Sequence, residues 1–215
     1  TTLFRSQITV SNIESTLCEL LKNYYMSDSW NKIYKLEFIR RSGIKFSLEK
    51  EYNGTDLLFN HQLLLNLPKI SVINKVLYNY HILENSRARR KNKQLQKGFL
   101  IILDNIIKEV EKREFSDLIY HQLSRLYVGF MYMASQDIYD SHLDSIKIRE
   151  KFNEFHATNR SYLLIHDRLK LRISFMDKLS LKIVALCLQS RSSFYLLFFL
   201  KLRKKLLGIL SGDQT

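Results

Sequence analysis

Apolar residues recur at helical spacing in two stretches of the first third of the chain. In residues 11–25 they return every three or four positions, after a serine and an asparagine that can cap a helix. A leucine-rich stretch begins at Asp56 and runs to Pro68. Because proline lacks an amide donor and restricts the residue before it, we expect this second helix to end near Asn66.

The stretches around this second helix have a mixed pattern. In residues 30–46 we expect a short extended piece, one or two helical turns at 36–41, a stop at Gly43 and another short strand. Residues 69–82 are rich in β-branched and aromatic side chains and alternate as a strand does. One face of that predicted strand holds Val76, Tyr78, Tyr80 and Ile82.

Beyond residue 86 the pattern becomes helical, and glycine and proline are sparse or absent. We therefore predict a mainly α, α+β chain in which a mixed part, residues 1–86, precedes an irregular helical bundle, residues 87–215. Two apolar helical stripes carry the second part of this prediction. They are Phe99, Ile102, Leu103, Ile106 and Val110, and then Ile119, Leu123, Leu126, Tyr127 and Phe130.

The end of the chain combines an apolar stripe with basic residues. A helix over residues 195–210 would place Lys201, Arg203, Lys204 and Lys205 on its flanks and opposite side. Such a helix suits an anionic membrane interface, and it equally suits docking on a helical bundle with its charges in water. The stripe contains Tyr195, Phe198, Phe199, Leu202, Leu206 and Ile209.

Composition adds a strong positive charge to this picture. The 215 residues carry a net charge of +13, and residues 86–97 contain six basic residues and no acid. Clustered cations favour an anionic partner. Cys18 and Cys187 have no neighbouring cysteine that would indicate a disulfide framework or a zinc site. Without a disulfide framework, a reducing, cytoplasmic setting is the default expectation, at the inner face of the cell membrane if the last helix binds lipid. The longest apolar run is too short to cross a bilayer, so we expect no transmembrane span.

Three segments, read in order, resemble the second half of bacterial family 2 glycosyltransferases with the A-type fold. They are WNKIYKLEFIRRSGIKF, GTDLLFNHQLL and KISVINKVLYNYHILENS, and the resemblance covers residues 13–86. The matching motif positions are Trp30, Lys32, Tyr34, Phe46, Asp56, Leu77, Tyr78, Tyr80 and Ser86.

The resemblance implies transfer of a sugar from a nucleotide-diphosphate donor to a hydroxyl of a glycan or lipid-linked acceptor, with inversion, in envelope polysaccharide or glycoconjugate synthesis. Asp56 would be the general base, because an acceptor hydroxyl is a poor nucleophile until its proton is removed. Trp30 would stack on the acceptor sugar. His81, Ser86 and Arg87 would contact the substrate, with the basic residues near the diphosphate.

Two positions depart from the family pattern, and one expected motif is missing. Thr55 stands where the family usually has glutamate, and His81 stands where many relatives have arginine. The Asp-x-Asp motif, which would hold Mg or Mn against the diphosphate, does not occur in this sequence. We therefore expect the metal only in a complete enzyme with a preceding nucleotide-binding half, and negligible transfer by residues 1–215 alone.

Each of these residues also has a structural interpretation. Asp56 can simply start its helix, Trp30 can pack in a core, His81 can be an ordinary strand residue, and Arg87 can lie in a solvated loop. The alternative function is a non-enzymatic basic helical module that binds nucleic acid or an anionic membrane surface. Nucleic acid is the weaker of these partners, because no helix-turn-helix glycine, zinc finger or RNA-binding aromatic motif is present. The sequence does not determine an oligomeric state.

Overall fold

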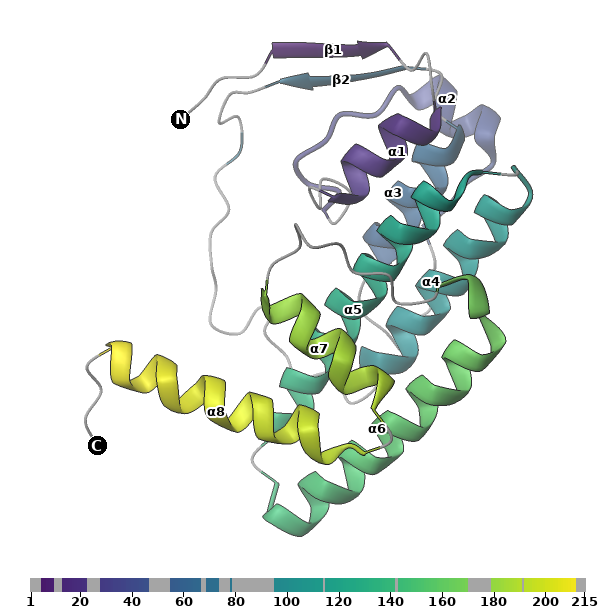
Figure 1. The fold of residues 1–215 in the computed structure, drawn as a ribbon. Coiled ribbons are helices and arrows are strands. Elements are labelled where there is room, and N and C mark those ends of the chain that lie inside the picture. Colours follow the sequence, from purple (N-terminus) through teal and green to yellow (C-terminus); the bar gives the residue numbers. More distant parts are fainter. Residues whose placement is uncertain are drawn as a thin grey trace. The chain divides into compact units, whose positions relative to one another are not determined.

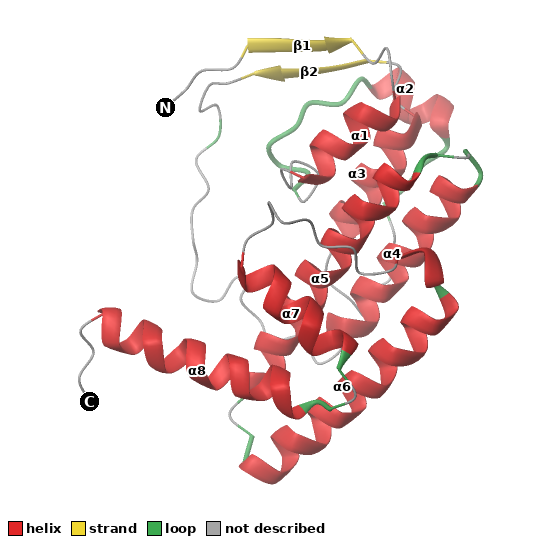
Figure 2. Cartoon of the chain, viewed as in Figure 1, coloured by secondary structure: helices red, strands yellow, loops and turns green. Residues whose placement is uncertain are grey.

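The computed structural model describes residues 5–9, 13–22, 28–46, 55–66, 69–73, 78, 95–113, 115–141, 143–169, 179–190 and 192–211. Within these residues the chain is mainly helical, which confirms the mainly α part of the predicted fold class (Figure 1, Figure 2). The elements are β1 (Arg5–Thr9), α1 (Ile13–Lys22), α2 (Leu36–Ser42), α3 (Thr55–Asn66), β2 (Lys69–Ile73), α4 (Leu95–Glu111), α5 (Asp117–Tyr139), α6 (Ser145–Ile165), the short 3-10 turn η2 (Asp167–Leu169), α7 (Leu179–Gln189) and α8 (Phe194–Ser211).

The chain forms two compact units, Thr1–Leu123 and Ser124–Thr215, so that α5 begins in the first unit and ends in the second. The predicted domain boundary after residue 86 lies outside the residues that the structure describes. Helix α4, which follows that boundary, packs on α3 within the first unit. The division into residues 1–86 and 87–215 therefore stays a prediction, while compactness groups α4 with the helices before it.

β1 and β2 pair antiparallel, with Arg5 opposite Ile73 and Thr9 opposite Lys69. The β2 strand begins where the alternating pattern predicted a strand, but it ends at Ile73, and Tyr78, which the prediction placed in the strand, has no regular structure. The pattern around residues 5–9 gave no such indication, because Ile8 is the one large apolar residue in that stretch. In the described part of the chain these two strands form the sheet, and a two-stranded sheet does not establish an A-type glycosyltransferase domain.

Helix α3 is the centre of the first unit. It contacts α1, α2 and α4, and its buried residues occupy nearly every position from Leu57 to Leu65. A helix that is buried all round must lie inside its unit rather than on the surface. Helix α4 covers it with the stripe predicted from the sequence. Phe99, Ile102, Leu103, Ile106 and Val110 are all buried.

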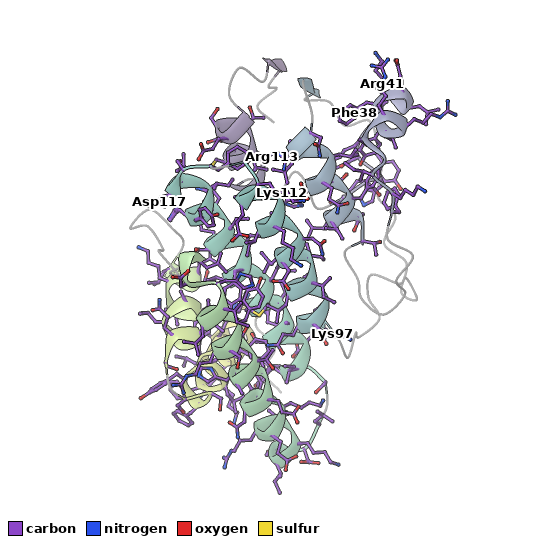
Figure 3. The ribbon with its side chains drawn as sticks, turned by 90° about the vertical axis from the view of Figure 1, so that its right-hand side faces the viewer. Phe38, Arg41, Lys97, Lys112, Arg113 and Asp117 are labelled. Carbon is purple, nitrogen blue, oxygen red and sulfur yellow. The ribbon has the colours of Figure 1, made fainter. Side chains whose placement is uncertain are left out.

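Polar contacts fasten the ends of the first unit's helices. Arg113, which follows α4, donates to Asn66 Oδ1 at 3.1 Å and to Glu109 Oε2 at 2.9 Å; Arg113 and Lys112 are labelled in Figure 3. Glu14 of α1 accepts hydrogen bonds from the Ser116 amide, at 2.9 Å, and from the Ser116 hydroxyl. Glu14 thereby places a carboxylate at the start of α5, where the helix dipole favours negative charge.

Part of the prediction for residues 30–46 is confirmed and part is wrong. Helix α2 forms where expected and ends at Gly43, which has φ 66°, a left-handed conformation that glycine adopts without a steric penalty. The short strand predicted after Gly43 is absent, since residues 44–46 have no regular structure. Phe46 instead stacks on Phe59 of α3, with the ring centroids 3.9 Å apart. The Phe46 side chain therefore packs on α3, and residues 44–46 form no strand.

The second unit contains the later part of α5 together with α6, α7 and α8. Tyr127 of α5 is fully buried, and its hydroxyl donates to Asn159 Oδ1 of α6 at 2.8 Å. Its ring stacks on Tyr162, with the planes within 5° of parallel. His156 Nε2 lies 2.7 Å from the carbonyl oxygen of Ser190, which joins α6 to the end of α7.

Candidate active site

Asp56 is the second residue of α3, so its carboxylate lies in the first turn of the helix. Its Oδ1 accepts a hydrogen bond from the Leu57 amide at 3.0 Å. The exposed amides and the helix dipole stabilise a negative charge at this position. The structural interpretation, in which Asp56 starts its helix, is therefore correct, and it leaves a catalytic role open because the side chain is only half-buried.

Burial raises the pKa of Asp56 above its ordinary value of 3.8. Hydrogen bonds from the Leu57 and Asp56 amides oppose this shift, the negative charge of Asp28 adds to it, and the positive charge of Lys32 lowers it. A carboxylate with a raised pKa accepts a proton more readily than an exposed one. The environment of Asp56 thus favours the chemistry that a general base needs.

Lys32 supplies a cation beside Asp56. Its ammonium donates to Asn31 Oδ1 at 2.6 Å and to the backbone carbonyl of Asp28. Burial lowers the pKa of Lys32, and the charges of Asp28 and Asp56 raise it. The ammonium is thus held by its own segment, and its positive charge acts on Asp56.

Tyr34 attaches this segment to α3. Its hydroxyl donates to Asn60 Oδ1 at 2.6 Å, and its ring meets the Phe59 ring edge-on with centroids 5.6 Å apart. Burial, with a contribution from the charge of Asp56, raises the pKa of Tyr34 to about 12. Asn60 follows Asp56 by four residues, which places both on the same side of the helix. Tyr34 therefore supports the fold beside the candidate base.

Trp30 lies at the surface of this segment. Its side chain is 42% exposed and packs on the ring of Tyr78, which is 50% exposed, with centroids 4.8 Å apart. The structure thus decides against the interpretation of Trp30 as a core residue. Exposed aromatic faces are surfaces on which a ligand with apolar faces, such as a sugar ring, can stack.

Three of the predicted substrate-binding residues, His81, Ser86 and Arg87, lie outside the described part of the chain. Their roles stay predictions. The structure therefore brings together Asp56 and the segment that carries Trp30.

Sequence reasoning missed Asn60 and His61 as neighbours of this site. The spacing of four residues between Asp56 and Asn60 was the available signal, because residues one helical turn apart lie side by side. The position of His61, five residues after Asp56, gives no such signal, and its link to the site is the positive charge of Lys32, which lowers the pKa of His61. His61 is fully buried, and its Nδ1 donates to the Leu57 carbonyl at 2.7 Å, so that Nε2 is the unprotonated nitrogen of the neutral ring. Burial lowers the pKa of His61 to about 4.

The divalent metal that the family resemblance implies stays an expectation for the complete enzyme. Within the ranges that the structure describes, no three histidine, cysteine or acidic side chains are grouped closely enough to hold a metal ion.

Comparisons with protein-family models, with curated proteins and with solved structures gave no match to this chain. The resemblance to family 2 glycosyltransferases consequently rests on the ordered motifs from Trp30 to Ser86 alone.

Proposed function

We propose that residues 13–86 form the acceptor side of an A-type, inverting glycosyltransferase that uses a nucleotide-diphosphate sugar, with Asp56 as the general base. The observation that carries this proposal is the half-buried Asp56 carboxylate, with its raised pKa, in the first turn of α3. The Trp-x-Lys-x-Tyr segment is attached beside it through the bond from Tyr34 to Asn60. The family resemblance rests on the same two motifs, because the Trp-x-Lys-x-Tyr segment is followed in sequence by the aspartate that opens a helix.

In the proposed reaction, a carboxylate oxygen of Asp56 takes the proton of an acceptor hydroxyl. At the same time the oxygen of that hydroxyl forms a bond to the anomeric carbon of the donor sugar. The bond from this carbon to the diphosphate breaks on the opposite face, and the nucleoside diphosphate leaves with the bonding electrons. Lys32 is a positioning residue in this scheme, because its charge favours the ionised form of Asp56 before the acceptor arrives. Trp30 and Tyr78 would support the acceptor ring.

The test uses the complete product of the source gene, with a panel of nucleotide-diphosphate sugars and Mg²⁺ or Mn²⁺. Release of nucleoside diphosphate and donor affinity are measured separately. Replacement Asp56→Asn should lower turnover by about 10²- to 10⁴-fold, since the amide cannot accept the proton. Donor affinity should change by less than about twofold, because Asp56 is assigned to the acceptor side.

Asp117→Asn is the matched control. Asp117 is also an acidic residue in the first turn of a helix, α5, but it is exposed. The control should leave turnover unchanged. Unaltered turnover in Asp56→Asn, or an equal loss in both variants, would reject Asp56 as the base.

A further inference from the structure

Helix α8, at the yellow end of the ribbon in Figure 1, contacts α7 and has one buried apolar face. Leu196, Leu197 and Leu200 are buried on this face. The guanidinium of Arg203 lies 5.5 Å from the ring centroid of Tyr132, on α5, a distance suited to a cation–π contact. These contacts cover the face of α8 that carries Leu196, Leu200 and Arg203.

A second apolar face of α8 points to solvent. It consists of residues that are each 46–62% exposed, and we call this set the outer stripe: Phe194, Tyr195, Phe198, Leu202 and Leu206. Phe194 and Phe198 stack on each other one turn apart, with ring centroids separated by 6.0 Å. A single exposed apolar side chain is ordinary, whereas five on one side of one helix mark an interaction surface.

The surroundings of the outer stripe are positively charged. Lys201 and Lys205 are exposed between its residues, and residues 178–210 contain seven basic residues and no acid. Lys204 reaches Asp140 at 3.7 Å, but both side chains are more than half exposed, and such pairs contribute little. An apolar stripe edged by lysines complements a surface that is apolar inside and anionic at its boundary.

We propose that α8 binds in the plane of an anionic phospholipid surface. The outer stripe enters the boundary between headgroups and acyl chains, and Lys201 and Lys205 contact the lipid phosphates. In-plane binding suits this helix because its opposite face is already docked on protein. A second copy of the chain fits less well, since it would bring two chains of net charge +13 together.

This inference does not depend on the proposed transfer reaction. None of the helices in the described ranges is sufficiently long and apolar to cross a membrane.

The experiment is co-flotation of the full chain with vesicles of phosphatidylcholine alone or of phosphatidylcholine with phosphatidylglycerol. The wild type should float with the anionic vesicles and bind them at least tenfold more tightly than the neutral ones. The double variant Phe198→Ser/Leu202→Ser should lose at least tenfold in affinity, because it removes apolar area from the lipid contact. Its matched control is Ile146→Ser/Leu164→Ser, which changes two exposed apolar residues of α6.

A second pair of variants tests the charge without altering the stripe. Lys201→Gln/Lys205→Gln should weaken binding to anionic vesicles by roughly fivefold for each lysine. Arg149→Gln/Lys151→Gln removes the same charge from exposed positions of α6 and should have little effect. Far-UV circular dichroism checks that each variant keeps its helix content.

Three results would overturn the proposal. The wild type could fail to float with anionic vesicles, or the α6 variants could weaken binding as much as the α8 variants. Light scattering could instead reveal a dimer that Phe198→Ser/Leu202→Ser separates into monomers, which would assign the outer stripe to a second copy of the chain.

Discussion

The hydroxyl of Tyr34 donates to the side-chain oxygen of Asn60 at 2.6 Å, one helical turn beyond Asp56. This bond joins residues 26 positions apart and connects the segment of Trp30 and Lys32 to the helix that carries the candidate base. A hydrogen bond that fixes a segment against a helix contributes to stability and also to the geometry of whatever the segment binds.

Replacement Tyr34→Phe should therefore lower the free energy of unfolding by about 1 kcal/mol, the usual net value of one hydrogen bond. It should also lower transfer activity of the gene's full polypeptide, by raising KM for the acceptor more than it lowers kcat, because the ring packing on Phe59 is kept. Urea titration and steady-state kinetics measure the two effects.

The control for Tyr34→Phe is Tyr195→Phe, which removes a hydroxyl from a side chain that is 57% exposed. Its stability should match the wild type within about 0.5 kcal/mol. Equal stability and equal kinetics in Tyr34→Phe and the wild type would contradict the role given to this bond.

Trp30 is the single tryptophan of the chain, so intrinsic tryptophan fluorescence reports on the exposed pair that it forms with Tyr78. We predict that the sugar ring of an acceptor shifts this fluorescence on binding, and that Trp30→Phe binds the same sugar less tightly, by roughly tenfold or less, because a smaller ring offers less contact area. A panel of monosaccharides is titrated, and calorimetry measures affinity in the variant.

Glycerol, which offers hydroxyls without a ring, is the control ligand and should leave the fluorescence unchanged. An identical fluorescence change with glycerol and with every sugar would show that the change comes from the altered solvent and not from binding of a sugar ring. Affinity retained in both Trp30→Phe and Tyr78→Ala would place sugar binding elsewhere.

Helices and their ends could be predicted from the sequence where residues close together in the chain determine them. Helix α3 followed from its leucines and from Pro68, and the end of α2 followed from Gly43. Strand β1 was missed because its pairing with β2 joins residues about sixty positions apart, and only Ile8 marks it in the sequence. Tertiary pairing of this kind overrides weak local preference.

The same limit of prediction from sequence applies to the candidate site. The sequence identified Asp56 and Trp30 by type and order, and it could not give their burial, which depends on packing around α3. The stripe predicted on α8 was right in its helical spacing, yet the sequence could not show that Leu196 and Leu200 would dock while Phe198 and Leu202 stayed exposed. Both faces are apolar, so only the packed structure distinguishes them.

His61 is fully buried on α3, five residues after Asp56, and its titration makes the stability of the fold depend on pH. Burial lowers the pKa of His61 to about 4, against an ordinary value of 6.5, so the native state binds fewer protons than the unfolded state between these pH values. Stability supplied by the neutral ring is fully present above pH 6.5 and is lost as the pH falls toward 4. At its upper limit this loss is about 3 kcal/mol, at 1.36 kcal/mol for each pKa unit.

Replacement His61→Leu should remove this part of the pH dependence, because leucine has no proton to bind in either state. Urea unfolding of both proteins at pH 8, 6, 5 and 4.5 gives the difference in free energy between them, in which the titration of other groups cancels. We predict that this difference moves in favour of the leucine variant as the pH falls below 6.5, by roughly 2 to 3 kcal/mol. A difference that stays constant across this range would show that the His61 ring gains its proton as easily in the native state as in the unfolded chain.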